Sequence, residues 1–300
     1  MPLTPGMISG MTDAIQSPRA DLINRVPPHA FFMVSAVFHY LGPSFAVLLF
    51  SHMGVLGVAW LRIASAAAIF AAWRRPWRVL IGGDRRARLL ILALGATLAL
   101  MNCAFYLAID RMPLASVAAI EFVAAIVVAL VGARTGRNII ALATAVVGVF
   151  FLIGFRWSGD GLGVLLAFAN AGLFGIYIVL GHAMSRMRGA SGVDRLGAAM
   201  LVALVVAMPI GVSEVVPVLS EPLLILAGVG VGGSSSVIPY VCDQLAMARL
   251  PRATFALMRT LLPATATVVG VVVLAQVPTL TEIAGILLVA IGVGLHKPPQ

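Results

Sequence analysis

Charged residues are scarce in this sequence. Asp, Glu, Lys and Arg make up 10% of its 300 residues, while 61% of the residues are hydrophobic and the mean hydropathy is +1.07. So few charges cannot cover the surface of a soluble domain of this length. The composition therefore excludes a soluble protein and predicts an all-α, polytopic membrane protein surrounded by the lipid bilayer.

Cysteine is nearly absent as well. Cys103 and Cys242 both lie in apolar runs, where a cysteine is ordinarily a small buried hydrophobe, so we expect neither a disulfide nor a cysteine metal site.

Residues 1–29 contain no apolar core of the length that a signal peptide needs. We expect them to form a cytoplasmic N-terminal tail, with the first hydrophobic run kept in the mature protein.

The polar residues are too few for most kinds of catalytic or cofactor site. No Ser-His-Asp set, metal-ligand cluster or pair of catalytic carboxylates can be assembled from them. The glycine- and serine-rich run 230–236 lacks the lysine of a phosphate-binding loop and lies inside an apolar span. The net charge of +9 comes from scattered basic residues rather than from a basic polar domain. We therefore expect no enzyme activity, cofactor, metal or nucleic-acid partner.

Long apolar runs are what the sequence has in abundance. Windows of about 20 residues, the length of a membrane-crossing helix, predict ten transmembrane helices with short connections. They cover residues 30–50, 54–73, 89–109, 113–132, 138–155, 161–184, 195–213, 223–248, 251–274 and 280–296. Most of the 20 Lys and Arg residues fall on the side that holds the N-terminus. Because cytoplasmic loops are enriched in these residues, we expect both termini, including a short tail at 297–300, in the cytoplasm.

The chain is internally repeated. When the sequence is shifted so that Glu121 meets Arg259, Asn102 falls on Tyr240 and the turns between them align as well. The two five-helix halves are residues 30–155 and 156–296. Because each half has an odd number of helices, the second half must cross the membrane inverted. Inverted repeats of this kind are typical of secondary transporters.

Several short motifs point to one transporter superfamily. These are Leu61-Arg62, Arg75-Pro76-Trp77-Arg78, Met101-Asn102, Phe105-Tyr106-Leu107, Pro113 through Glu121-Phe122, Ile238-Pro239-Tyr240, Leu250-Pro251 and Thr254-Phe255. In these motifs the chain resembles the drug/metabolite transporter superfamily with two EamA-type halves, and within it the threonine/homoserine and aromatic amino-acid exporters. The resemblance implies a ten-helix amino-acid exporter of the bacterial inner membrane that works by alternating access.

The chain departs from the family pattern at two carboxylates. Leu262 stands where the pattern has a Glu just before the proline of the ninth helix, and Gln276 replaces a Glu ahead of the tenth. In the fourth helix, Ala125 replaces the equivalent proline. These departures favour facilitated movement of the substrate over exchange for protons.

Two charges lie deep inside predicted helices. Glu121 is ~12 Å from the outer end of its helix at 1.5 Å per residue, and Arg259 is about as deep from the other side. A charge at mid-bilayer costs at least about 2.5–3.5 kcal/mol, so each must face the bundle interior. Either they pair and join the two halves, or Arg259 faces a substrate carboxylate and Glu121 faces its ammonium group or a proton. Both hold if substrate separates the pair.

Arg62 and Asp243 are two further charges inside predicted helices. We expect Arg62 to clamp a helix end or to pair with Glu121, since a guanidinium can donate to several carbonyls or to a carboxylate. Asp243 lies near the cytoplasmic end of its helix and close to Arg249 in sequence. A cytoplasmic gate or ion pair is its expected role, with proton carriage as the alternative.

Histidine, tyrosine and amide side chains are spread over four of the predicted helices. A tyrosine combines an apolar face with one hydroxyl, and an amide supplies a donor and an acceptor, which suits a cavity for amino acids. Taken singly, each has helix packing as its alternative role. The candidate pathway residues of this kind are His39, Tyr40, Asn102, Tyr106, Tyr177, Tyr240 and Gln244.

The expected function is export of amino acids, threonine- or homoserine-like and also aromatic or other neutral ones, through a central cavity between the halves. The expected partners are a small-molecule substrate and the bilayer, with the chain acting as a monomer. Two alternatives stay open. One is export of another small metabolite or a drug. The other is a lipid flippase, which predicts a groove that is open to lipid and lined by apolar residues.

Overall fold

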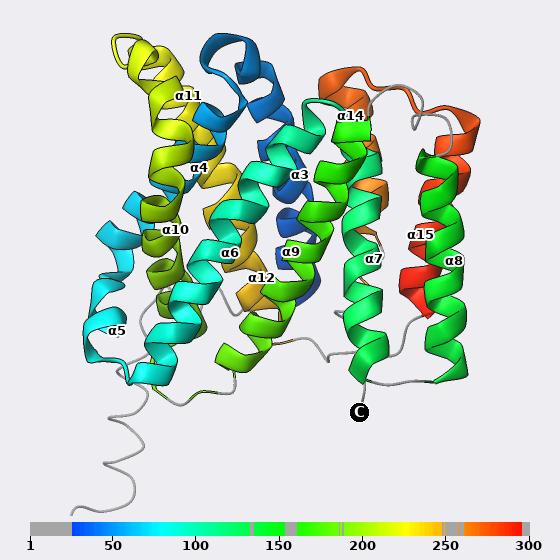
Figure 1. The fold of residues 1–300 in the computed structure, drawn as a ribbon, viewed down its shortest axis with the longest axis horizontal. Helices are drawn as coiled ribbons and strands as arrows, with labels where there is room; N and C mark the ends of the chain where they lie inside the picture. The colour runs from blue at the N-terminus through cyan, green and yellow to red at the C-terminus, as the bar shows by residue number, and fades with distance from the viewer. Residues whose placement is uncertain are drawn as a thin grey trace, which may run out of the picture.

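A computed structural model shows a fold in which the secondary structure of the described residues is entirely helical (Figure 1). The structure describes residues 26–132, 135–153, 161–185, 187, 189–247, 249, 258 and 261–295. The helices up to residue 153 are α3 (Pro28–Met53), α4 (Val55–Arg74), α5 (Trp77–Gly82), α6 (Arg85–Ile109), α7 (Leu114–Gly132) and α8 (Gly136–Ile153). The helices after it are α9 (Gly161–Ser185), α10 (Gly192–Val215), η1 (Val216–Val218), α11 (Pro222–Gly232), η2 (Gly233–Val237), α12 (Ile238–Met247), α14 (Leu262–Leu274) and α15 (Leu280–Leu295).

The described helices confirm the predicted apolar rods. Six of them are long and apolar enough to cross a membrane, and four shorter apolar helices accompany them in the part of the chain that the structure describes. The ninth predicted helix, 251–274, is described as a helix from Leu262 onward, and most of its earlier part lies outside the described residues. So do residues 297–300 and nearly all of the expected tail 1–29. The cytoplasmic termini and the inverted repeat stay predictions.

The eighth predicted helix differs from a regular α-helix. Between α11 and α12, the five residues of η2 form a π-helix, a wider turn that is frequent at functional sites. This turn packs against α4, and a Cβ atom on Gly232, the residue before it, would lie 2.7 Å from the Arg62 carbonyl oxygen. The sequence predicted one helix at 223–248, interrupted at Pro239, and did not predict the π segment that precedes this proline.

The helices lie side by side in one bundle (Figure 1). α8 packs along α15 at one end of the bundle, and α4 packs along α10 toward the other. Between them, α6 packs along α9 and α12 along α3. Each of these four pairs joins a helix from residues 30–155 to one from residues 156–296. The two predicted halves therefore interlock rather than stand apart.

Glycines make the contact between α8 and α15 very close. A Cβ atom on Gly148 would lie 2.7 Å from the Gly285 carbonyl oxygen, and one on Gly285 would lie 2.8 Å from the Gly148 carbonyl oxygen. Small residues of this kind let membrane helices approach backbone to backbone, and the resulting van der Waals packing is one of the forces that drive their association in lipid. Both positions therefore require glycine.

Gly148→Ala is expected to destabilise the protein by about 1–3 kcal/mol, because the added methyl group overpacks the α8–α15 contact. The matched control is Gly172→Ala in α9, where nothing lies within 4 Å of an added Cβ atom. Thermal unfolding of both purified variants in detergent checks the difference. Equal unfolding midpoints for the two variants would contradict the close packing described above.

α4 is also tied to α10 at both of its ends. At one end Arg74 Nε donates to Asp194 Oδ1 at 2.7 Å. At the other end the Gly57 N–H donates to Glu214 Oε2 at 2.7 Å, so a carboxylate lies at a helix N-terminus, where negative charge is favoured. An exposed ion pair such as Arg74–Asp194 contributes about 1 kcal/mol or less. Packing between the two helices therefore contributes more to the stability of the α4–α10 contact than this ion pair does.

Candidate functional site

A narrow cavity lies inside the bundle where α3, α4, α6, α7, α9 and α12 meet. Its volume is about 50 Å³, which is room for a few water molecules. Seven of its lining residues are ones that the sequence analysis predicted for the pathway or for a gating role. They are His39, Arg62, Asn102, Glu121, Tyr177, Tyr240 and Asp243. The fold thus brings most of the predicted residues to one place.

Glu121 on α7 lies at the cavity with 9% of its surface exposed. Its Oε2 accepts a hydrogen bond of 2.8 Å from Nδ2 of Asn170 on α9. A buried carboxylate is stable only where such bonds or an opposite charge compensate for lost hydration. The Asn170 amide supplies one of these bonds and joins α7 to α9 beside the cavity.

Arg62 on α4 is buried at the same cavity. Its Nε donates to Ser236 Oγ at 3.0 Å, and an Nη atom donates to the backbone oxygen of Ser235 at 3.2 Å. The guanidinium carbon also lies 5.3 Å from the ring centroid of Tyr106, within the range of a cation–π contact. Arg62 therefore ties α4 to the π segment η2, while its expected roles, clamping a helix end or pairing with Glu121, stay predictions.

Asn102 and Tyr240, which the predicted repeat would align, both line the cavity. Asn102 lies on α6 and donates through Nδ2 to the Leu98 carbonyl oxygen at 2.7 Å. Tyr240 lies on α12, one residue after the Pro239 carbonyl that accepts from Ser35 Oγ at 3.1 Å. The two residues thus contribute to one cavity from different helices.

Aromatic rings contribute apolar surface to this region. Phe174 and Tyr177, one turn apart on α9, stack with their ring centroids 5.9 Å apart. Phe122 of α7 meets Phe174 edge-on at 6.5 Å, and on α3 the His39 ring meets Tyr40 edge-on at 5.3 Å. Apolar surface beside a few fixed polar groups is the usual make-up of a small-molecule site.

Known proteins resemble this chain in sequence and in fold. The sequence pattern of the EamA-like transporter family matches residues 161–296. The threonine/homoserine exporter RhtA of Salmonella typhimurium is 33% identical over 253 residues, covering 83% of each chain. RhtA of Escherichia coli K12 is 32% identical over 245 residues, covering 81% of each chain. This chain belongs to the EamA-like transporter family.

Membership of the family confirms the resemblance inferred from the short motifs. It also confirms that the chain is a transporter and not an enzyme. A crystal structure of another protein, 18% identical, aligns with this EamA-like transporter at a TM-score of 0.52. The alignment covers 89% of this chain and 96% of the other. At that identity the likeness concerns the fold alone.

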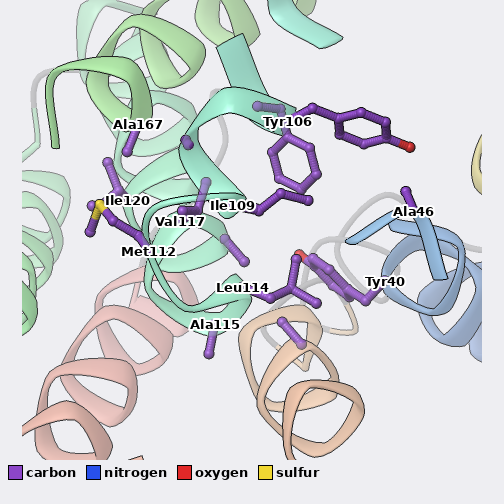
Figure 2. Close-up of a cluster of buried hydrophobic side chains, with 14 of the residues drawn as sticks. Tyr40, Ala46, Tyr106, Ile109, Met112, Leu114, Ala115, Val117, Ile120 and Ala167 are labelled. Atoms are coloured by element: carbon purple, nitrogen blue, oxygen red, sulfur yellow. The ribbon is translucent and has the colours of Figure 1, made fainter. Parts of the chain in front are cut away.

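Two predicted pathway residues of the transporter lie in the core. Tyr40 is 2% exposed and Tyr106 is fully buried, and both belong to the apolar cluster drawn around the α6–α7 turn (Figure 2). Neither is among the residues that line the cavity. The Tyr106 ring packs against the Arg62 guanidinium. The Tyr106 hydroxyl has no hydrogen-bond partner among the described residues. Tyr40 lies on α3 and Tyr106 on α6. The spans of both helices are apolar on all sides, so the sequence did not show which face of either helix points toward the cavity.

Arg259 and the side chain of Gln244 lie outside what the structure describes. Pairing of Glu121 with Arg259 therefore stays a prediction. Sequence reasoning missed Asn170 and Phe174, which line the cavity from α9. An amide in the middle of an apolar span was the signal that could have found Asn170, because polar groups there need a reason.

Proposed function

We propose that this transporter exports amino acids across the bacterial inner membrane, with threonine and homoserine as leading substrates and aromatic or other neutral amino acids as further ones. The observation that carries the proposal is a buried cavity that combines the carboxylate of Glu121, the guanidinium of Arg62 and aromatic rings. A zwitterion with a small side chain needs opposite charges and apolar surface together. The names of the RhtA relatives support the substrate class.

Alternating access between two inverted repeats is part of the proposal. The cavity of about 50 Å³ is too small for an amino acid, so the surrounding helices must separate to admit one. The equivalent positions Asn102 and Tyr240 supply walls of the same cavity, as expected for a site at a repeat interface. In this proposal both termini lie in the cytoplasm. Arg259 is the third charged residue of the pathway, beside Glu121 and Arg62.

Facilitated movement, rather than exchange for protons, is the form of transport we favour. Gln276 stands where the family pattern has a carboxylate, and its Oε1 accepts from the Leu114 N–H at 3.1 Å. A neutral amide here caps the N-terminus of α7. Gln276 therefore serves as a helix cap at the position where the family pattern has a glutamate, a group that can carry a proton.

An apolar groove beside α7 and α9 is the observation that favours the lipid alternative. Its volume is about 600 Å³, and all the described residues that line it are apolar: Ile120, Val123, Ala124, Val127, Phe168, Ala171, Gly172, Gly175, Ile176, Val179 and Leu180. It suits hydrocarbon, but a lipid headgroup finds no polar partner among these residues. We therefore rank lipid flipping second.

Efflux of labelled threonine and tryptophan from proteoliposomes tests the proposal. We expect threonine to leave these vesicles faster than it leaves vesicles without protein, and to exchange in counterflow. A fluorescent phospholipid in the same vesicles reports flipping. If neither amino acid moves, amino-acid export is overturned, and lipid movement in that case would favour the alternative.

A further inference from the structure

Asn170 holds a position that its bond to Glu121 only partly explains. The residue is fully buried in the middle of α9 and lines the cavity. Its Nδ2 donates to Glu121 Oε2 at 2.8 Å. Its carbonyl oxygen, Oδ1, is also buried but has no hydrogen-bond partner among the described residues. A buried acceptor without a donor costs free energy and calls for an explanation.

The orientation of the Asn170 amide is set by its neighbour. Exchanging the amide oxygen and nitrogen would place Oδ1 against the Glu121 carboxylate, where two acceptors would face each other. The bond from Nδ2 to Glu121 therefore keeps Oδ1 turned to another part of its surroundings. Glu121 can accept further bonds, because a carboxylate has about four lone-pair sites. Glu121 and Asn170, which both line the cavity, thus hold one charged and one neutral acceptor within a single hydrogen-bonded pair.

A primary ammonium group matches this pair of acceptors. It carries three N–H donors, no acceptor and a positive charge, so one donor can go to Glu121 while a second goes to Asn170 Oδ1. A single hydroxyl has one donor and cannot serve both at once. A site with a buried acceptor also rejects a ligand that lacks the donor, because the acceptor is then left unpaired.

We propose that Asn170 Oδ1 and the Glu121 carboxylate form the subsite for the α-ammonium group of the exported amino acid, so that Asn170 is a specificity-determining residue. This inference rests on the proposed function. It assigns selection for amines to α7 and α9, the two helices that the Asn170–Glu121 bond already joins. The bound ammonium group would satisfy the buried oxygen that the described residues leave unpaired.

The test compares two ligands that differ only at the ammonium group, L-threonine and 3-hydroxybutanoate, as competitors of labelled threonine efflux from proteoliposomes. In the wild type we expect threonine to compete at least about 100-fold better. Asn170→Leu removes one charge-assisted bond, so threonine should compete about 10- to 100-fold less well. Competition by 3-hydroxybutanoate should stay unchanged, since it lacks the group that Asn170 binds.

Gly172→Ala on the same helix is the matched control and should compete as the wild type does. If Asn170→Leu does not fold, the same competition is measured with Asn170→Ala. The preference of the wild type for threonine over 3-hydroxybutanoate tests the inference independently of either variant. Wild-type protein that accepts both ligands equally, or an Asn170 variant that loses both equally, overturns the inference and leaves amino-acid export standing. Wild-type protein that does not move threonine overturns the proposed function, and this inference with it.

Discussion

Glu121→Gln is expected to lower threonine efflux by about 30-fold or more while leaving the protein folded. Gln has nearly the same shape and still offers an oxygen to Asn170 Nδ2. It lacks the negative charge that an ammonium group meets in a buried site. Removing one partner of a buried charged pair costs about 2–5 kcal/mol in binding, and each 1.4 kcal/mol is tenfold. The loss should therefore fall on substrate binding.

Glu214→Gln is the matched control for this experiment. Glu214 is another carboxylate within the bundle, but it caps α4 by accepting from the Gly57 N–H and does not line the cavity. Its Gln variant keeps an acceptor for that bond, so efflux should be nearly unchanged. Efflux by Glu121→Gln that equals the wild type, across the pH range in which carboxylates and histidines titrate, would remove Glu121 from the transport pathway.

The fold was predictable because each helix carries its own signal. An apolar run such as 161–184 is long enough to cross a bilayer on its own account, and the observed α9, Gly161–Ser185, follows it closely. The π segment η2 was not predictable in this way. Its carbonyl and hydroxyl groups bond to Arg62, far away in the sequence, so the partner that holds the wider turn becomes visible only in three dimensions.

The cavity was predictable where a residue is costly to bury. Glu121 and Arg62 stand out in apolar helices because a buried charge must face something polar, and both line the cavity. Tyr40 could not be placed, since a tyrosine packs in the core as readily as it lines a cavity. Asn170 was missed because a single uncharged amide among apolar residues costs less to bury than a charge and is therefore a weaker signal. Its role becomes visible only when the structure places Glu121 beside it.

Arg62→Met is expected to destabilise the protein by about 2–5 kcal/mol, the second large effect. Arg62 binds the Ser235 carbonyl oxygen and Ser236 Oγ inside the bundle, and its loss leaves buried acceptors unpaired, at about 1–3 kcal/mol each. Arg62→Lys should recover only part of this stability, because a lysine cannot donate in the fixed fork of a guanidinium. Thermal unfolding in detergent measures both variants. Arg74→Met is the control, because the exposed Arg74–Asp194 pair contributes about 1 kcal/mol or less.

A double variant, Arg62→Met with Ser236→Ala, separates the clamp from simple loss of packing. If Arg62 stabilises the π segment through Ser236, the second change adds little once the first is made, and the coupling reaches about 0.5–3 kcal/mol. If the two effects simply add, Arg62 stabilises the bundle in some way other than through Ser236. A coupled pair would mean that η2 keeps its wider turn only while the guanidinium of α4 holds it. Any movement of α4 away from η2 during transport would then release this turn.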